Sequence, residues 1–360
     1  MKYLFIVQGD GRGHMTQAIT LSEMLQRNGH EVVEALIGKS KEREIPAFFL
    51  TKMKTNVQPF ETPSFIFKND KKHIHLAKTI LYNLSPEQIK KYAKSIEMIY
   101  KKIIALKPDV ILNFYEMLTG FVYLRYNLKI PIIAVGHQYL QRHPDFRFSD
   151  IEDKSMLLFK LFTVFCNIGA TKSLGLSFYP MSNSIPDRLA VVPPLIRKEV
   201  REMNPSPGEY ILGYMLNPGY EKEIRNWHEE NPEIELHVFW DKKGAAKEIS
   251  VDDTFTLHAL DDELFLEYMA GCKGYVTTAG FESICEAMYL DKPILMIPAH
   301  LEQEINAAEA VFVQAGIVAG SFNIGLLLEH INKRQFDNTS FKRWVDSGEE
   351  IFMQHLIHNS

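Results

Sequence analysis

The chain has 360 residues, of which 46% are hydrophobic and 24% charged, and its formal net charge is −5. A chain of this length is longer than a typical single domain, so we expect two domains. The negative net charge argues against general nucleic-acid binding. The three cysteines form no C-x-x-C pair, and no stretch reaches the ~18 apolar residues of a membrane-spanning helix, which together predict a globular, cytosolic protein.

The first predicted elements are a buried strand and a helix, joined by a glycine-rich loop. Residues 2–7, KYLFIV, form an uninterrupted apolar run, as in a strand covered on both faces. Residues 15–25 carry apolar side chains at helical spacing, and Gly29 follows as a helix C-cap. The loop between them, GDGRGH at residues 9–14, therefore ends at a helix start, where unpaired backbone N–H groups favour an anion.

This loop has competing interpretations. A dinucleotide-binding fingerprint would need a third glycine where His14 stands and an acid near Leu36 and Ile37, and a P-loop would need G-K-[ST]. A plain glycine turn followed by a surface histidine is the structural alternative. The functional alternative is a site where an anionic or hydroxyl-bearing ligand approaches the backbone and His14 transfers a proton.

A lysine-rich segment lies between Glu61 and Lys107. It holds ten lysines and four acidic residues, a local charge of +6 in a chain of net charge −5. Within it, residues 85–108 have the pattern of an amphipathic helix with Ser85 as N-cap and Pro86 in the first position. These lysines form either an ordinary solvated face or a surface attracted to anionic lipid or to a phosphorylated ligand.

Strand-like and helical segments alternate along the whole chain. Apolar runs at 109–114, 130–136 and 189–196 continue the first series, a polar stretch with two prolines follows Ile196, and a second series of runs begins at residue 210. This alternation predicts two α/β domains with parallel sheets. Such sheets bind ligands beyond the carboxyl ends of their strands, so a cleft between the two domains is the expected site.

The most specific stretch is YVTTAGFESICEAMYLDKPILMIPAHLEQEINAAEA, which begins at Tyr275. A strand ends near Thr277, and Gly280 lets a ligand approach the start of the next helix. There, backbone N–H groups and the Ser283 hydroxyl suit a phosphate. Glu286 lies one turn further on the same helix face, where a carboxylate suits a ribose diol. Glu302 and Gln303, after the next strand, carry groups that bind sugar hydroxyls.

On these motifs, with the histidine-bearing loop at 9–14, the sequence resembles the GT-B glycosyltransferases. It is similar in particular to the inverting UDP-glycosyltransferases, a group that includes the peptidoglycan lipid-intermediate N-acetylglucosaminyltransferase. The resemblance implies an α/β fold of two Rossmann-like domains whose parallel sheets face a central cleft. Residues 1–195, with a C-terminal helix at about 340–360, would bind the acceptor, and residues 205–335 would bind the nucleotide-sugar donor.

The resemblance also implies roles for particular residues in the donor domain. Ser283 and the amides around Gly280 would hold the diphosphate, Glu286 the ribose, and Glu302 with Gln303 the sugar. Two features depart from the family: many relatives have a histidine where Thr278 stands, and the loop MLNPG at 215–219 has few glycines. The donor-binding residues implied are Asn217, Gly219, Leu260, Thr278, Ala279, Gly280, Phe281, Ser283, Glu286, Glu302 and Gln303.

In the acceptor domain, His14 would be the general base that takes a proton from the acceptor hydroxyl, and Glu116 would orient it or act as an alternative base. The absence of a D-x-D motif predicts a reaction without a metal ion, and no cofactor is expected. An acid is missing at Thr278, where a retaining enzyme would have one, so inversion is expected. The acceptor-binding residues expected are Gly11, Arg12, Gly13 and His137, and His137 could equally be a satisfied loop histidine.

Two alternative functions stay open at this point: a nucleotide-sugar 2-epimerase of the same fold, and a non-catalytic protein that binds nucleotide sugars. The expected partners are a UDP-sugar, with dTDP as the alternative nucleotide, and an acceptor hydroxyl on a compound that is phosphorylated or lipid-linked. No nucleic-acid partner is expected. A weak association with an anionic membrane surface would place the protein at the inner face of the membrane.

Overall fold

A computed structural model describes residues 1–40, 44–64, 66, 75–147, 156–215, 218–242, 244, 246–333 and 337–357. The chain divides into two compact units, each with its own sheet. The N-terminal unit comprises Met1–Ile66, His75–Arg197 and Trp344–Ser360, and the C-terminal unit holds Lys198–Arg343. Both are α/β, so the predicted fold class is confirmed.

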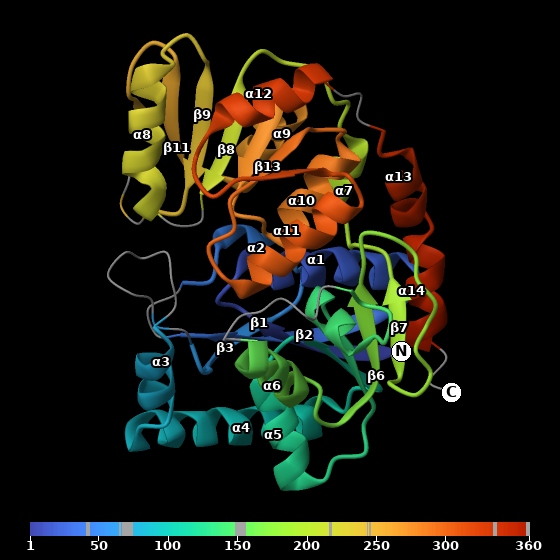
Figure 1. Cartoon of the computed structure of the whole chain (residues 1–360). Helices are drawn as coiled ribbons and strands as arrows, with labels where there is room; N and C mark the ends of the chain where they lie inside the picture. The colour runs from blue at the N-terminus through green and yellow to red at the C-terminus, as the bar shows by residue number, and fades with distance from the viewer. Residues whose placement is uncertain are drawn as a thin grey trace. The chain divides into compact units, whose positions relative to one another are not determined.

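The sheet of the N-terminal unit has seven parallel strands in the order β3-β2-β1-β4-β5-β6-β7 (Figure 1). The predicted first strand is central: Phe5 pairs with Ala35 on one side and with Leu112 on the other. Two strands were not expected from the sequence, because Pro59 interrupts the edge strand β3 and Lys172 interrupts β6. The strands are β1 Lys2–Gln8, β2 Glu31–Lys39, β3 Val57–Glu61, β4 Val110–Phe114, β5 Ile132–Val135, β6 Ala170–Leu176 and β7 Leu189–Val192.

Helices pack on this sheet through their apolar faces. Ile99 and Ile103 of α4 and Leu118 of α5 join one core cluster with the strands. Helix α1 ends in a Schellman motif, because Gly29 adopts φ 76° and the His30 amide donates to Leu25 O at 2.9 Å. The helices are α1 Arg12–Arg27, α2 Ala47–Lys52, α3 Leu76–Asn83, α4 Pro86–Leu106, α5 Met117–Tyr126, the 3₁₀ helix η1 His137–Arg142, α6 Met156–Cys166 and α14 Gly348–Ile357.

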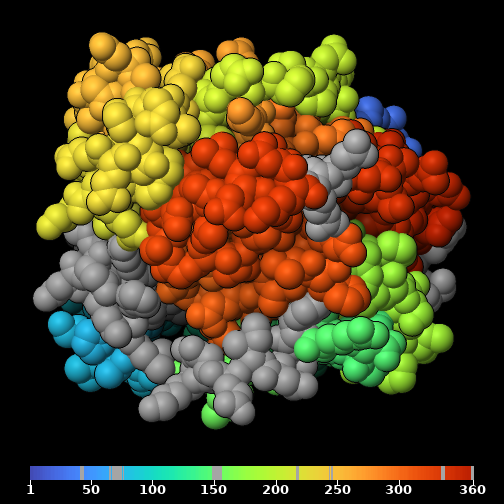
Figure 2. All heavy atoms as spheres, turned by 45° about the horizontal axis from the view of Figure 1, so that its top comes forward, coloured from blue at the N-terminus to red at the C-terminus, as the bar shows by residue number. Residues whose placement is uncertain are grey.

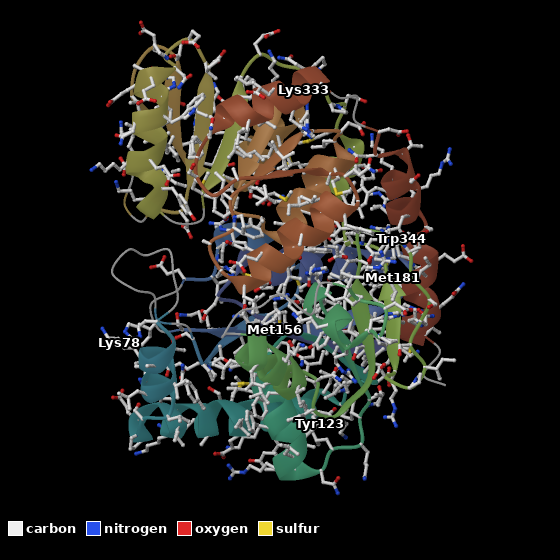
Figure 3. All side chains as sticks on the ribbon, in the orientation of Figure 1. Lys78, Tyr123, Met156, Met181, Lys333 and Trp344 are labelled. Atoms are coloured by element: carbon white, nitrogen blue, oxygen red, sulfur yellow. The ribbon has the colours of Figure 1, made fainter. Side chains whose placement is uncertain are left out.

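The predicted helix at 85–108 is thus α4, and Pro86 is its first residue. Ser85 occupies the N-cap position, but its side chain makes no capping hydrogen bond. The last helix of the chain, α14, belongs to the N-terminal unit. There Tyr3 Oη donates to Leu356 O at 3.2 Å, and Trp344 Nε1, labelled in Figure 3, donates to Ser177 O at 2.9 Å.

The sheet of the C-terminal unit also has seven strands, in the order β10-β11-β9-β8-β12-β13-β14. All neighbours are parallel except β10 and β11. Helix α12 packs on β12 and β13, and the region of its colour lies at the surface in Figure 2. Leu326 of this helix is 40% exposed. The strands are β8 Ile211–Met215, β9 Leu236–Trp240, β10 Glu248–Ser250, β11 Phe255–Ala259, β12 Gly274–Thr277, β13 Ile294–Met296 and β14 Gly316–Val318.

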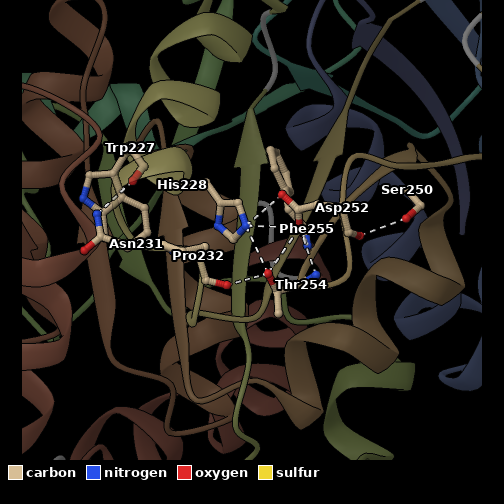
Figure 4. A network of polar contacts seen from close by, with 8 residues as sticks. All are labelled: Trp227, His228, Asn231, Pro232, Ser250, Asp252, Thr254 and Phe255. Carbon is tan, nitrogen blue, oxygen red and sulfur yellow. Dashed lines mark hydrogen bonds and ion pairs between the residues drawn. The ribbon is translucent and has the colours of Figure 1, made fainter.

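A polar network closes the turn before β11 (Figure 4). Asp252 Oδ1 accepts from the Phe255 amide at 2.8 Å and lies 3.3 Å from Nε2 of the buried His228, and Thr254 Oγ1 donates to Pro232 O at 2.7 Å. The helices of this unit are α7 Lys198–Glu202, the 3₁₀ helix η2 Pro218–Tyr220, α8 Glu221–Glu230, α9 Asp262–Gly271, α10 Phe281–Tyr289, α11 Leu301–Phe312 and α12 Ile324–Lys333, followed by α13 Thr339–Asp346. None of the described helices is long and apolar enough to cross a membrane.

Candidate functional site

The glycine-rich loop joins β1 to α1, as the sequence predicted. Gly9 packs against β2: its amide donates to Gly38 O at 2.6 Å, and a Cβ at Gly9 would lie only 2.8 Å from that oxygen. Gly11 differs, because a Cβ there would meet nothing within 4 Å. Gly11 is also the N-cap of α1, and within the described structure no side chain caps this helix. The start of α1 therefore offers backbone N–H groups beside open space.

Arg12 and Gly13 form the first turn of α1, beyond Gly11. The Arg12 guanidinium lies 5.5 Å from the ring centre of Phe48 in α2, a cation–π distance. This contact orients the charge of Arg12 at the helix start. The expected acceptor residues Gly11, Arg12 and Gly13 are thus contiguous at one open helix N-terminus.

His14 is half-buried in the same turn, and two contacts fix its ring. Its Nδ1 lies 3.2 Å from Gln17 Oε1, and its ring stacks on Tyr115 at 5.5 Å between centroids and 27° between planes. An amide oxygen can only accept, so in the neutral ring this contact favours the proton on Nδ1 and leaves Nε2 as the acceptor.

Tyr115 is a site residue that the sequence analysis missed. It follows β4 directly and adopts φ 58°, a left-handed conformation that is costly outside glycine. Its hydroxyl lies 2.7 Å from Thr163 Oγ1, and its ring contacts Tyr139 and Phe162. The signal in the sequence was its position at the carboxyl end of a central strand, immediately before Glu116.

Glu116 is fully buried and caps α5. Its Oε1 accepts from the Leu118 amide at 3.0 Å and from Thr62 Oγ1 at 2.7 Å. Among the described residues, Oε2 has no hydrogen-bond partner, and a Cβ at Gly38 would collide with it. Burial raises the pKa of this carboxyl to about 7, and the hydrogen bonds from Leu118 and Thr62 oppose that rise.

These contacts give Glu116 a structural role, and its expected role as the residue that orients His14 or replaces it as base stays a prediction. Glu116 has no exposed surface, and its described hydrogen-bond partners are Thr62 and Leu118 rather than His14. Its backbone amide also donates to Asn113 Oδ1 at 3.0 Å, which fixes the turn after β4. Glu116 thus holds the turn that carries Tyr115, whose ring stacks on His14.

His137 is the first residue of η1 and is only 3% exposed. Its Nδ1 lies 2.7 Å from Leu176 O, and its ring meets the edges of Phe146 and Phe178. These contacts favour the structural alternative for His137, and a role in lining the acceptor site stays a prediction.

In the C-terminal unit, the loop from β12 to α10 is the centre of the expected donor site. Ala279, not Gly280, takes the left-handed conformation, with φ 64°. Gly280 is the N-cap of α10, and in the described structure no side-chain hydrogen bond caps this helix. A Cβ at Gly280 would meet only Ser283 Oγ, at 3.5 Å. Space and open N–H groups therefore coincide at the start of α10.

Ser283 is bound locally within this loop. Its hydroxyl donates to Gly280 O at 3.1 Å and lies 3.5 Å from Thr277 Oγ1. A rotation about χ1 would free the hydroxyl for a ligand at the helix start. Glu286, one turn further along α10, is 3% exposed.

Two side chains of α11 hold the loop from the other side. Gln303 Nε2 donates to Thr278 Oγ1 at 3.3 Å, and Gln303 Oε1 accepts from the Ala299 amide at 2.9 Å. Asn306, which the sequence analysis did not select, donates to Ala279 O at 3.0 Å and so fixes the left-handed residue. Its signal in the sequence was its position three residues after Gln303, on the same helix face.

The remaining expected donor residues lie at the carboxyl ends of parallel strands. Leu260 directly follows β11, Gly219 lies in η2 after β8, and Phe281 opens α10 after β12. Glu302 is half-exposed in the first turn of α11, after β13. Asn217 lies outside the described residues. The described members of the set thus gather at one edge of this sheet.

Comparisons with known proteins agree with this architecture. A family model described as glycosyl transferase family 1 matches residues 1–336. Among curated protein sequences, none matches the chain. The solved structure of the calicheamicin glycosyltransferase CalG4 aligns with a TM-score of 0.63, at 13% identity over 99% of this chain and 98% of that one.

Two further solved structures are similar over both units. UGT89C1 of Arabidopsis thaliana, complexed with UDP, has a TM-score of 0.62 at 13% identity, over 97% of this chain and 94% of its own. MurG of Acinetobacter baumannii has a TM-score of 0.57 at 14% identity, over 99% of both chains. At such identities the likeness establishes the fold, and it matches the two-domain fold expected from the sequence.

Proposed function

We propose, from the premise that this chain belongs to glycosyl transferase family 1, that it transfers a sugar from a UDP-sugar to an acceptor hydroxyl. The reaction proceeds with inversion and without a metal ion. The observation that carries the proposal is the open start of α10. There, uncapped N–H groups, the space above Gly280 and the Ser283 hydroxyl coincide.

Different residues of the C-terminal unit bind the successive parts of the donor. The α10 amides and the Ser283 hydroxyl donate hydrogen bonds to the diphosphate, whose negative charge the helix dipole favours. Glu286 binds the ribose hydroxyls, and Glu302 and Gln303 bind the sugar. Gln303 already has one amide N–H on Thr278 Oγ1, so it also keeps the loop in place. The ligands of two similar solved structures support this assignment. Arabidopsis UGT89C1 is complexed with UDP, and the spinosyn rhamnosyltransferase SpnG is complexed with thymidine diphosphate.

In the transfer step, His14 Nε2 takes the proton of the acceptor hydroxyl as that oxygen attacks the anomeric carbon. The bond from this carbon to the diphosphate breaks on the opposite face, and the electron pair leaves with UDP. The α10 amides stabilise the charge that develops on the leaving group, as in other electrostatic stabilisation of a transition state. The Gln17 contact keeps the proton of the resting imidazole on Nδ1.

The proposal is tested by ligand binding and by turnover, measured separately. A nucleotide present at ~100 times its dissociation constant should raise the free energy of unfolding by ~2.7 kcal/mol. We expect this stabilisation from UDP and UDP-sugars, and a larger effect of dTDP would reassign the nucleotide. A UDP-sugar incubated alone should stay unchanged. Its conversion to a 2-epimer would instead assign the site to an epimerase, and binding without turnover on any hydroxyl acceptor would assign a sensor.

A further inference from the structure

Tyr275 carries a hydroxyl inside the C-terminal unit that no described residue binds. The side chain lies in β12 and is fully buried, and its ring meets Phe265 of α9 edge-on, with 6.1 Å between centroids and 65° between planes. Its Oη has no hydrogen-bond partner among the described residues. A buried hydroxyl without a partner is costly, because it has lost the hydrogen bonds that water would give it. A phenylalanine would fill the same space without that cost, so the hydroxyl calls for an explanation.

The hydroxyl of Tyr275 belongs to a cluster with those of Thr277 and Ser283. Tyr275 and Thr277 are two positions apart on β12, so their side chains leave the same face of the strand. Thr277 Oγ1 lies 3.5 Å from Ser283 Oγ, at the start of α10. Burial raises the pKa of the Tyr275 phenol far above its usual range, and the hydroxyls of Ser283 and Thr277 oppose that rise. The phenol is therefore protonated near neutral pH, and it lies close enough to these two hydroxyls for them to act on it.

The hydrogen bonds of this cluster leave one position open. A serine hydroxyl donates one hydrogen bond and can accept two. Ser283 gives its proton to Gly280 O at 3.1 Å, and Thr277, at 3.5 Å, supplies at most one donor. Among the described residues, one lone pair of Ser283 Oγ thus remains to accept a hydrogen bond. Tyr275 Oη, on the same side of the strand, carries the proton that would fill this position.

We propose that Tyr275 is a positioning residue of the donor site and acts through Ser283. When Ser283 turns its proton from Gly280 O to the diphosphate, Tyr275 Oη donates to Ser283 Oγ and holds that oxygen in place. The phenol then gains the partner that it lacks in the free protein, so donor binding relieves an unfavourable burial. This inference rests on the proposed function, and it adds a residue that touches neither the sugar nor the diphosphate.

The test compares Tyr275→Phe with the parent in two measurements. In urea unfolding without nucleotide, the variant should have a midpoint equal to or above that of the parent, because it loses an unpaired polar group and keeps the ring. In titration calorimetry, its affinity for UDP should be about tenfold lower. The matched control is Tyr210→Phe, which loses a hydrogen bond from Oη to Tyr268 O at 2.9 Å in the same unit. This control should have a lower midpoint and an unchanged UDP affinity.

A double-mutant cycle shows whether Tyr275 acts through Ser283. Ser283→Ala should weaken UDP binding, and adding Tyr275→Phe to it should cause no further loss. The same loss from Tyr275→Phe in both backgrounds would overturn the inference, and so would a lower unfolding midpoint in Tyr275→Phe. Weaker binding in Ser283→Ala but not in Tyr275→Phe would overturn this inference alone. A parent that binds neither UDP nor dTDP would overturn the proposed donor site as well.

Discussion

His14 Nδ1 and Gln17 Oε1 lie 3.2 Å apart, one turn from each other on α1. Helical geometry places residues three apart on the same face, so the contact depends only on the helix that the loop begins. The partner is an uncharged amide. It orients the ring and, in the neutral imidazole, favours the proton on Nδ1 without placing a negative charge beside the ring.

Replacement of His14 should affect turnover and spare donor binding. In His14→Ala, we expect the rate to fall by roughly 10²–10⁴, the usual contribution of a general base, while UDP affinity stays unchanged. The measurement is steady-state turnover beside calorimetric titration with UDP. The comparison is His137→Ala. Because His137 is buried and bound to Leu176 O, this variant should be less stable but should show no specific fall in turnover. Full activity of His14→Ala would exclude it as the base.

A carboxylate at position 17 should shift the pH dependence of the reaction. In Gln17→Glu, the new charge beside Nδ1–H stabilises the imidazolium, so the ascending limb of the pH–rate profile should move to higher pH. Gln17→Leu should lower the maximal rate without such a shift, because it loses orientation only. Profiles of kcat/KM for both variants distinguish the two effects. Identical profiles in parent and Gln17→Glu would mean that this contact does not act on the base.

Glu116 should make stability depend on pH. Its folded-state pKa of about 7 lies above the value of the unfolded chain, so the folded protein keeps the proton to higher pH. Its stabilising contribution is therefore complete below about pH 4 and is lost as pH rises to about 7, a change of about 3 kcal/mol. Urea unfolding across this range should show the decline in the parent, and the Glu116→Gln variant should lack that component. Parallel curves for the two proteins would contradict the burial of an ionisable carboxyl here.

Glu286 is expected to bind the ribose of the donor. Glu286→Gln removes the charge and changes the volume little, and it should weaken UDP binding by about 1–3 kcal/mol, the value of a hydrogen bond to a charged group. Titration calorimetry with UDP measures this loss. Glu329→Gln, on the exposed side of α12, is the control that should bind UDP like the parent. An unchanged affinity in Glu286→Gln would remove this residue from the donor site.

Asn306 should couple stability to donor binding. Asn306→Ala leaves the buried carbonyl of Ala279 without its donor and should lower the free energy of unfolding by about 1–3 kcal/mol. It should also weaken UDP binding, because the left-handed residue before α10 is no longer held. Asn231→Ala loses a similar amide-to-carbonyl bond, at 2.8 Å to Trp227 O, far along the chain from this loop (Figure 4). We expect the control to lose stability alone. Equal UDP affinity in both variants would leave Asn306 a purely structural role.

Much of the fold could be predicted because its signals are local. The buried strand at 2–8, the helix beginning at Pro86 and the loop before α10 each follow from apolar runs, proline or glycine within a few residues. The clustering of the expected donor-binding segments could be predicted in the same way, because in a parallel sheet with alternating helices the carboxyl ends of the parallel strands lie at one edge. Strands β3 and β6 escaped prediction because a proline or a lysine interrupts their apolar pattern.

The sequence by itself determined which segments become strands and helices, and which residue types stand at the strand ends. Only the tertiary structure decided their roles. Glu116 meets Thr62 across 54 positions of the chain, so its burial is invisible in local sequence. His137 is enclosed by residues up to 41 positions away. In α3, apolar periodicity predicts a buried face, but Thr79 accepts from the Ile66 amide and Asn83 donates to Ser64 O, while Leu81 is 76% exposed. Burial is a property of contacts between distant segments, and no local pattern specifies it.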